Sequence, residues 1–244
     1  MAKWNATRNP TQTKTNSRFS VLAASVLGAL ILIPIFGFTA GRVNAAEPAV
    51  EIPAPALDQT LPPGGGLQTV VLAGGCFWGV EAVFDALTGV ERAVSGYAGG
   101  EERSAKYDMV CTGKTGHAEA VEITYDPSSI PLRRLLEVYF LVAHDPTQLD
   151  RQGHDVGPQY RSAVFYTGDE QKAIAQAYIR ELENAKVFSK PIVTALEPLR
   201  AFYPAEDYHQ RFVALNPDHP YVCQSDKPKL EHLRKRFPEL LKTA

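Results

Sequence analysis

Apolar residues change their period along the chain, and the changes predict the secondary structure. Gln68–Ala73 is a short apolar run rich in β-branched residues, which is typical of a buried strand. Over residues 76–87 the apolar side chains recur at helical spacing until Thr88-Gly89 ends the pattern. Val90–Tyr97 then predicts a second strand, and the Gly-rich, charged stretch 96–109 predicts a long loop of a kind that is often functional.

Residues 119–125 alternate between two faces of a predicted strand. Glu119 shares its face with Val121, Ile123 and Tyr125, so the carboxyl begins a largely apolar face at its rim. A carboxyl pushed toward a core has a raised pKa and stays protonated near neutral pH, which is the state a general acid needs. The alternative is a Glu at a strand end that points into water.

The second half of the chain continues the mixture of helices and strands. We expect a helix from Pro131 to near His144, a polar loop over 145–159, a strand over 161–166, a helix from a capping box at 167–170 to about Lys186, a strand over 191–197, a short helix within 204–215 and a final amphipathic helix over 229–241. The elements do not alternate strictly as β-α-β. The pattern therefore predicts one α+β domain, a mixed β-sheet with helices packed on it.

The N-terminal region, residues 1–45, has the order of a secretory leader. Residues 1–18 are basic and carry no acid, and the following 22 residues, Phe19–Ala40, carry no charge. Val43-Asn44-Ala45 then offers a signal peptidase a cleavage pattern, and Pro34 interrupts the apolar run, so a signal peptide is favoured over an uncleaved membrane anchor. Either predicts that the rest of the chain lies outside the cytoplasm, exported to the periplasm or tethered to the membrane. Residues 46–67 are rich in Pro and Gly and predict a linker before a domain over 68–244.

Charge and cysteine content exclude some classes of protein. The 25 basic and 27 acidic residues are nearly balanced, which gives no reason to expect nucleic acid as a partner. Three cysteines, an odd number, do not make a disulfide framework, and no C-x-x-C indicates a thioredoxin-type site. The six histidines show no metal-binding spacing. We therefore expect no metal and no cofactor, and we expect a monomer.

One cysteine stands where a nucleophile is commonly placed. The stretch Gly74-Gly75-Cys76-Phe77-Trp78-Gly79 joins the first predicted strand to the first helix. Free N–H groups and the helix dipole favour the thiolate at such a position, and the two glycines leave room for a tight turn and a substrate. Phe77 and Trp78 are candidates for an apolar wall. A buried structural cysteine is the alternative, because free Cys is among the most buried residue types.

Two motifs together resemble the A-type peptide methionine sulfoxide reductases. Gly75-Cys76-Phe77-Trp78-Gly79 is followed by Thr115-Gly116-His117-Ala118-Glu119, and the resemblance runs from about Thr69 to the C-terminus. It implies a two-layer sandwich and the thiol-dependent reduction of methionine S-sulfoxide, free or in proteins, as a repair of oxidised proteins. It implies that Cys76 attacks sulfur, that Glu119 protonates the leaving oxygen, and that Phe77 and Trp78 wall the cavity.

Three further residues match family positions around the substrate. The resemblance implies that Tyr107 and Tyr160 hydrogen-bond the sulfoxide oxygen and that Asp155 occupies a supporting acidic position. Phenolic hydroxyls suit an apolar site because they polarise an S–O bond without carrying charge. The alternatives are tyrosines that pack on the surface and an Asp155 that braces a turn. His209, in the matching stretch 206–210, is interpreted as mainly structural.

A sulfenic acid on Cys76 needs a second thiol, which condenses with it to a disulfide. Members of the family commonly carry a resolving cysteine in the C-terminal region, so Cys223 is favoured over Cys111, and a structural Cys111–Cys223 bridge is a further alternative. A thioredoxin or a thioredoxin-like dithiol is the implied reductant. Two rival functions remain, a thiol peroxidase that uses Cys76 and a membrane-tethered binding module without activity.

Overall fold

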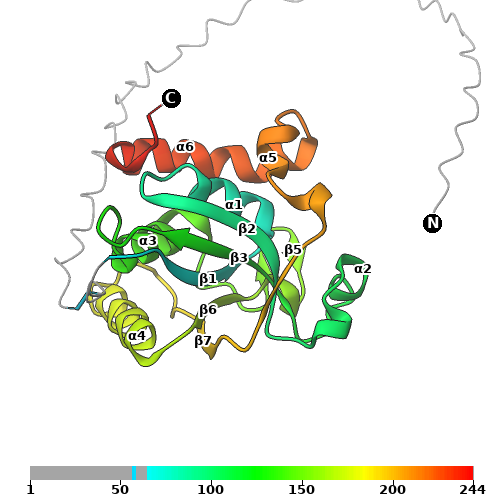
Figure 1. The fold of residues 1–244 in the computed structure, drawn as a ribbon, viewed down its shortest axis with the longest axis horizontal. Coiled ribbons are helices and arrows are strands. Elements are labelled where there is room, and N and C mark those ends of the chain that lie inside the picture. The colour runs from blue at the N-terminus through cyan, green and yellow to red at the C-terminus, as the bar shows by residue number, and fades with distance from the viewer. Residues whose placement is uncertain (1–56, 59–64, 244) are drawn as a thin grey trace, which may run out of the picture. The chain divides into compact units, whose positions relative to one another are not determined.

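The structure is a computed structural model that describes residues 57–58 and 65–243 (Figure 1). The leader expected over 1–45 lies outside the described residues, as does most of the expected linker over 46–67. Within the part of the chain that the structure describes, no helix is both long enough and apolar enough to span a bilayer.

A six-stranded sheet organises the domain, with the strand order β7-β6-β1-β3-β2-β8. Its strands are β1 (Gln68–Gly74), β2 (Val90–Ala98), β3 (Ala118–Tyr125), β6 (Ser162–Tyr166), β7 (Ala195–Pro198) and β8 (Phe202–Pro204). Only β6 and β7 pair in parallel, and the other neighbours are antiparallel, so the sheet is mixed as predicted. β7 begins later than the strand expected over 191–197, and β8 was not predicted. The short pair β4 (Arg151–Gln152) and β5 (Asp155–Val156) stands apart within the expected polar loop.

The sheet is curled so that its two edges approach each other. Only Leu199–Ala201 separate the edge strands β7 and β8 along the chain, although four strands lie between them in the sheet. A flat sheet would place these edges roughly 24 Å apart, whereas the link reaches at most about 14 Å. The inner face of the curl is built largely from small side chains, against which Leu199 and Phe202 pack. The buried side chains of this face are Val71, Ala73, Ala98, Ala118, Ala120, Ala163 and Phe165.

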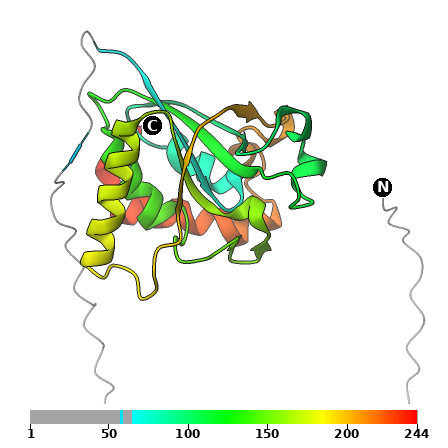
Figure 2. The ribbon, with the colours of Figure 1, turned by 90° about the horizontal axis from the view of Figure 1, so that it is seen from below.

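Helices cover the other face and form the main core with it (Figures 1 and 2). The helices of the domain are α1 (Phe77–Asp85), α2 (Tyr107–Val110), α3 (Leu132–Val138), α4 (Asp169–Asn184), α5 (Phe212–Leu215) and α6 (Lys227–Arg236), of which α2 lies to one side of the sheet and α5 packs on α1 (Figure 1). α3 continues as a π-helical turn over Tyr139–Ala143, and another π-helical turn, Val222–Asp226, precedes α6. Figure 1 shows α6 lying along α1. A mixed sheet with helices on one face confirms the predicted α+β class and the two-layer sandwich.

Two details of the helices differ from the prediction. Gly168 is the N-cap of α4 and no side chain caps the helix, so the capping box expected over 167–170 is wrong. The Thr167 N–H instead donates to Gln171 Oε1 at 3.0 Å. α6 begins two residues before the expected start and ends at Arg236, after which Pro238–Leu240 forms a 3₁₀ turn.

Candidate active site

Cys76 is the N-cap of α1, directly after β1, which confirms the predicted strand-turn-helix position. Gly75 makes the turn with a φ of 85°, a conformation that favours glycine. A Cβ on Gly75 would also come within 2.6 Å of the Gln152 side chain. Cys76 is 9% exposed, so its sulfur stands at the bottom of a site and not on an open surface.

Glu119 lies beside this thiol on β3. One of its carboxylate oxygens accepts the Phe77 N–H at 3.1 Å, which ties the carboxyl to the first residue of α1. The side chain is buried, and burial raises its pKa to about 8, with a further raising effect of Asp155, against the lowering effect of the Phe77 N–H. The carboxyl is therefore largely protonated at neutral pH. This confirms the expectation of a carboxyl that holds a proton on the apolar face.

A cavity of about 270 Å³ brings the predicted site residues together. It is lined by Cys76, Phe77, Trp78, Tyr107, Glu119, Asp155, Tyr160, His219 and Tyr221. The sequence singled out seven of these residues, contributed by α1, α2, β3, β5 and the 3₁₀ turn Pro158–Tyr160. His219 and Tyr221 were not predicted. Neither Cys111 nor Cys223 lines the cavity.

Phe77 and Trp78 form an aromatic wall of the cavity, and residues of the segment between β8 and α6 pack against it. The Trp78 ring stacks on Phe212 with centroids 3.7 Å apart and planes 7° from parallel. Its indole N–H donates to Nδ1 of the buried His209 at 3.1 Å. His209 also packs against the Phe77 and Tyr107 rings, and burial lowers its pKa. The imidazole is therefore a neutral support for the aromatic wall, in agreement with the structural role expected of it.

Tyr107 is positioned through its backbone. Its N–H donates to Glu206 Oε1 at 3.0 Å, and the other oxygen of Glu206 accepts the Tyr97 hydroxyl at 2.8 Å. Burial raises the pKa of both Tyr107 and Tyr160, and the neighbouring Glu119 adds to the effect in each case. Both phenols therefore keep their protons and remain able to donate hydrogen bonds into the cavity.

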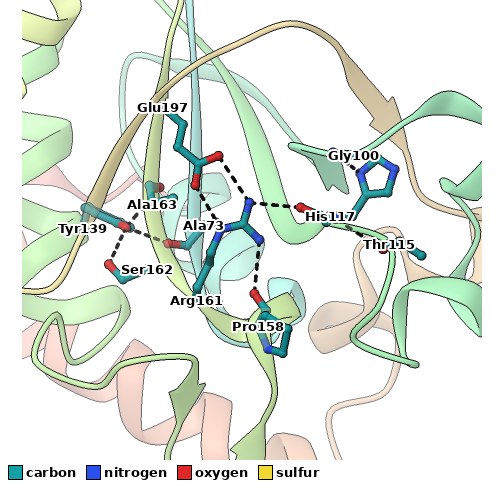
Figure 3. A network of polar contacts seen from close by, with 11 residues as sticks. Ala73, Gly100, Thr115, His117, Tyr139, Pro158, Arg161, Ser162, Ala163 and Glu197 are labelled. Carbon is teal, nitrogen blue, oxygen red and sulfur yellow. Dashed lines mark hydrogen bonds and ion pairs between the residues drawn. The ribbon is translucent and has the colours of Figure 1, made fainter.

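Arg161, the residue after Tyr160, ties the 3₁₀ turn Pro158–Tyr160 to its surroundings through the contacts that Figure 3 shows. The Arg161 guanidinium donates to Glu197 Oε1 at 3.0 Å and to the carbonyls of Pro158 and Gly116, both at 3.2 Å. His117 fixes the adjoining loop, because its ring accepts the Gly100 N–H and contacts the Glu101 carbonyl at 3.0 Å. Part of the Thr115–Glu119 motif thus fixes the loop that follows β2.

Tyr221 was missed from the sequence because it lies in an apparently loop-like segment without periodicity. Its hydroxyl donates to Asp155 Oδ2 at 2.5 Å, and burial together with Cys76 and Asp155 raises its pKa. The edge of the Tyr221 ring meets the Trp78 ring. Asp155 therefore holds a tyrosine of the site, a supporting contact like the one the resemblance implied. The signal available in the sequence was an aromatic residue two positions before Cys223.

The charge state of the thiol differs from the sequence expectation. Burial raises the pKa of Cys76, and the acidic side chains of Glu119 and Asp226 add to this effect when they are ionised. The backbone N–H of Trp78 and the Lys229 ammonium lower the pKa of the thiol but do not outweigh burial. The prediction that the helix N-terminus favours a resting thiolate is therefore wrong for the free site, where the thiol is the favoured form.

All three cysteines are free. Cys223 is exposed, and its Sγ lies 3.5 Å from the Pro217 carbonyl. Cys111 is also exposed, and partial burial of its thiol raises its pKa, against the lowering effect of a hydrogen bond with Tyr107. The alternative of a structural Cys111–Cys223 bridge is not present. Among the described residues, no group of three or more His, Cys, Asp or Glu side chains is arranged to hold a metal ion.

The chemistry of this cavity defines a class of protein. A thiol nucleophile shares a small, partly aromatic space with a protonated carboxyl and two phenolic donors, which together serve attack on an atom that carries a leaving oxygen. This arrangement is that of a thiol-dependent oxidoreductase.

Comparisons with known proteins give the family. The family profile "Peptide methionine sulfoxide reductase" matches residues 68–241. Peptide methionine sulfoxide reductase MsrA 2 of Mesorhizobium japonicum is 54% identical over 184 residues, covering 75% of this chain and 93% of that protein. Peptide methionine sulfoxide reductase MsrA of Thermus thermophilus is 51% identical, covering 72% and 98%.

Solved structures agree with these relatives. Reduced Mxr1 from Saccharomyces cerevisiae superposes with a TM-score of 0.57 at 34% identity, covering 66% of this chain and 91% of that one. Methionine sulfoxide reductase A of Corynebacterium diphtheriae gives 0.55 at 35% identity, covering 68% and 86%. The chain belongs to the peptide methionine sulfoxide reductase family, in its A type.

Proposed function

We propose that this chain reduces methionine S-sulfoxide, in proteins and as the free amino acid, and so repairs oxidised proteins. The observation that carries the proposal is the placement of Glu119, which is protonated near neutral pH and bonded to the residue next to Cys76. Attack on a sulfoxide needs a nucleophile for sulfur and a proton for oxygen at the same place. Specificity for the S epimer follows from the family and is part of the proposal.

The first half-reaction transfers oxygen to Cys76. The Cys76 sulfur attacks the sulfoxide sulfur while Glu119 protonates the oxygen and the phenols of Tyr107 and Tyr160 hydrogen-bond it. The attack forms an S–S bond, and the proton of the Cys76 thiol replaces the one that Glu119 gives to the oxygen. The hydroxyl then passes from the substrate sulfur to the Cys76 sulfur as the substrate S–O bond and the S–S bond break, methionine leaves, and Cys76 is left as a sulfenic acid. The substrate sulfur gains two electrons, and the Cys76 sulfur loses them. Phe77 and Trp78 hold the methyl group.

The second half-reaction resets the enzyme. A second thiol attacks the sulfenic sulfur, water leaves, and a disulfide forms. We assign this thiol to Cys223, whose exposed Sγ must move away from the Pro217 carbonyl to reach Cys76. A thioredoxin or a thioredoxin-like dithiol then supplies two electrons and returns both cysteines to thiols.

The epimers of a methionine sulfoxide peptide test the activity. With dithiothreitol as reductant, the full chain is expected to consume the S epimer only, and Cys76→Ser is expected to be inactive. Equal turnover of both epimers, or activity in Cys76→Ser, would overturn the proposal. Glu119→Gln separates the reductase from the rival thiol peroxidase, which does not need this acid. Sulfoxide turnover that persists in Glu119→Gln would favour the peroxidase.

Peptide mapping of the oxidised protein tests the assignment of the resolving thiol. After one turnover without reductant, the expected cross-linked peptides contain Cys76 and Cys223. Cys223→Ser is then expected to accumulate the sulfenic acid and to lose turnover with thioredoxin. A Cys76–Cys111 disulfide would show that Cys111, and not Cys223, is the resolving thiol.

We further propose that the chain acts outside the cytoplasm as a monomer. The location outside the cytoplasm rests on the basic, apolar and small-residue order of residues 1–45. Fractionation of cells that express the full chain, with N-terminal sequencing, is expected to find the enzyme in the periplasm with residues 1–45 removed. An intact N-terminus in the membrane fraction would indicate the anchor, and a cytoplasmic product would contradict export. Light scattering of the isolated enzyme tests the monomer.

A further inference from the structure

A buried ion pair that the reaction above does not use lies beside the start of α1. Asp226 ends the π-helical turn Val222–Asp226, and its side chain is fully buried. Neither of its carboxylate oxygens has a hydrogen-bond partner. The Lys229 ammonium, one turn further along, lies 4.0 Å from Asp226 Oδ1. A buried carboxylate with so little support is costly, so its place calls for an explanation.

Gly79 shows how close this pair lies to the nucleophile. A Cβ on Gly79 would come within 2.2 Å of Asp226 Oδ1 and 3.0 Å of Lys229 Nζ. Gly79 is in the first turn of α1, three residues after Cys76. Only a residue without a side chain leaves room for both charges against this turn.

Lys229 also shares a hollow with the thiol. Beside the catalytic cavity lies a larger hollow of about 600 Å³, and both are lined by Cys76, Asp155 and Tyr221. Lys229 lines the larger hollow together with Cys76. Its side chain is 21% exposed, so the ammonium is only partly screened by solvent.

The other groups around Cys76 do not supply a positive charge. Glu119 from β3, Asp155 from β5 and Asp226 from the π-helical turn are acids. The phenols of Tyr160 and Tyr221 stay protonated because burial raises their pKa. His144, which follows the π-helical turn after α3, has a pKa lowered by burial to about 3 and is neutral. Among the groups that influence the Cys76 thiol, Lys229 is the cation.

We propose that Lys229 is a positioning residue that stabilises negative charge on the Cys76 sulfur, and that Asp226 holds Lys229 at the start of α1 while partly neutralising it. The consequence for sulfoxide reduction rests on the proposed function. The effect on the thiol itself does not, because it is measured without any sulfoxide.

The two members of the pair have opposite effects on Cys76, and this gives the test its contrast. A negative charge near the thiol raises its pKa and a positive charge lowers it. Removing the charge of Asp226 is therefore expected to increase thiolate, and removing the charge of Lys229 to decrease it. A merely structural disturbance would move both variants in the same direction.

The experiment follows alkylation of Cys76 by iodoacetamide as a function of pH. Full-length Cys111→Ser/Cys223→Ser protein serves as background, so that Cys76 is the remaining thiol. At pH 7.5, Asp226→Asn is expected to react roughly three- to tenfold faster than the background protein, and Lys229→Gln slower by a similar factor. Lys229→Arg keeps the charge and is expected to restore the background rate. Near-ultraviolet circular dichroism confirms that each variant is folded.

The pH profile adds a second readout. Burial raises the pKa of Asp226 to about 6, with Asp155 adding to the effect, although Lys229 lowers it. The carboxylate is charged above this pH and neutral below it. Asp226→Asn should therefore exceed the background protein above pH 6 and converge with it near pH 5. Two folded variants that both slow the alkylation, a Lys229→Gln rate equal to the background, or an Asp226→Asn advantage that persists at pH 5 would each overturn the proposal.

Discussion

Single residues of the site are kept uncharged by burial, and this determines how activity depends on pH. Burial raises the pKa of both Cys76 and Glu119, so the free site holds a proton on the thiol and another on the carboxyl. Glu119 is thus ready to protonate a leaving oxygen, whereas the thiol must lose its proton as it attacks. Charge on sulfur therefore develops during the reaction and is not present beforehand.

The pKa of Glu119 is expected to set the upper pH limit of the reaction. Its pKa is raised to about 8, so the acid form is present below that value and is lost as the pH rises through it. The single-turnover rate is expected to fall above about pH 8. Glu119→Gln is expected to slow this step by roughly 10²- to 10⁴-fold, because the amide donates no proton. Stopped-flow release of methionine measures both effects. An unchanged rate from pH 7 to 10 would contradict the role of Glu119.

Asp155 and Tyr221 are predicted to act as one unit. Their 2.5 Å hydrogen bond is the contact that places the Tyr221 hydroxyl beside Cys76. Tyr221→Phe and Asp155→Asn are each expected to lower kcat/KM about tenfold, and the double variant to lose little more. Steady-state kinetics of the three variants form a double-mutant cycle. Fully additive losses would mean that the two side chains act separately.

Sequence reasoning located the chemistry of these residues better than it predicted their charge. The turn before α1 and the alternation of residues 119–125 made Cys76 and Glu119 candidates, and the family resemblance assigned them to one site, where the structure places both. The pKa of Cys76 depends on Asp226 and Lys229, about 150 residues further along the chain, whose approach no local pattern indicates. Tyr221 was missed for the same reason.

The side chains of the site lie at or near the ends of helices and strands, so the positions of these ends determine where the side chains lie. The start of α1 meets β3 through Glu119 and the π-helical turn Val222–Asp226 through Asp226. The strands with strong apolar patterns were predicted nearly in full, because a buried strand shows its period locally. β8 is only Phe202–Pro204 and is defined by pairing with β2, which a local pattern does not contain.

The uncapped start of α4 gives a prediction at this scale. Gly168 has the extended backbone of an N-cap, with φ −165° and ψ 170°, and a Cβ there would meet nothing within 4 Å. Gly168→Ser is expected to stabilise the domain by a few tenths to about 1 kcal/mol, since its hydroxyl can accept a free N–H of the first turn. Gly168→Ala, which offers no oxygen, is the matched control and is expected to be less stable than Gly168→Ser. Urea unfolding measures both. Equal stability of the two variants would contradict the capping argument.

The whole domain holds its site at the place where the curled sheet brings distant segments together. Arg161 contacts Glu197 of β7, the carbonyl of Gly116 before β3, and Pro158 beside the catalytic cavity (Figure 3). The α+β class followed from the order of the predicted elements. The curl did not, because it depends on the pairing of β8 with β2, which the sequence did not reveal.

Arg161 is therefore predicted to matter for both stability and substrate binding. Arg161→Ala is expected to lower the free energy of unfolding by about 1–3 kcal/mol and to raise KM, since Tyr160 is the last residue of the 3₁₀ turn that Arg161 ties down through the Pro158 carbonyl. Arg161→Lys is expected to rescue only part of the loss because it lacks the planar fork. Arg92→Ala is the control, since its ion pair with Glu122 is 3.5 Å long and its side chain is 65% exposed, and it is expected to cost about 0–1 kcal/mol. Urea unfolding and steady-state kinetics measure the losses. Equal losses for Arg161→Ala and Arg92→Ala would contradict this role.

The central claim is that the Cys76 sulfur takes the oxygen of the sulfoxide. The most direct test is a single turnover of the full-length Cys111→Ser/Cys223→Ser protein with a methionine S-sulfoxide peptide and no reductant, followed by dimedone and mass spectrometry. The account predicts one methionine released per protein molecule and one dimedone adduct, on Cys76. Methionine release without oxidation of Cys76, or no release at all, would contradict it.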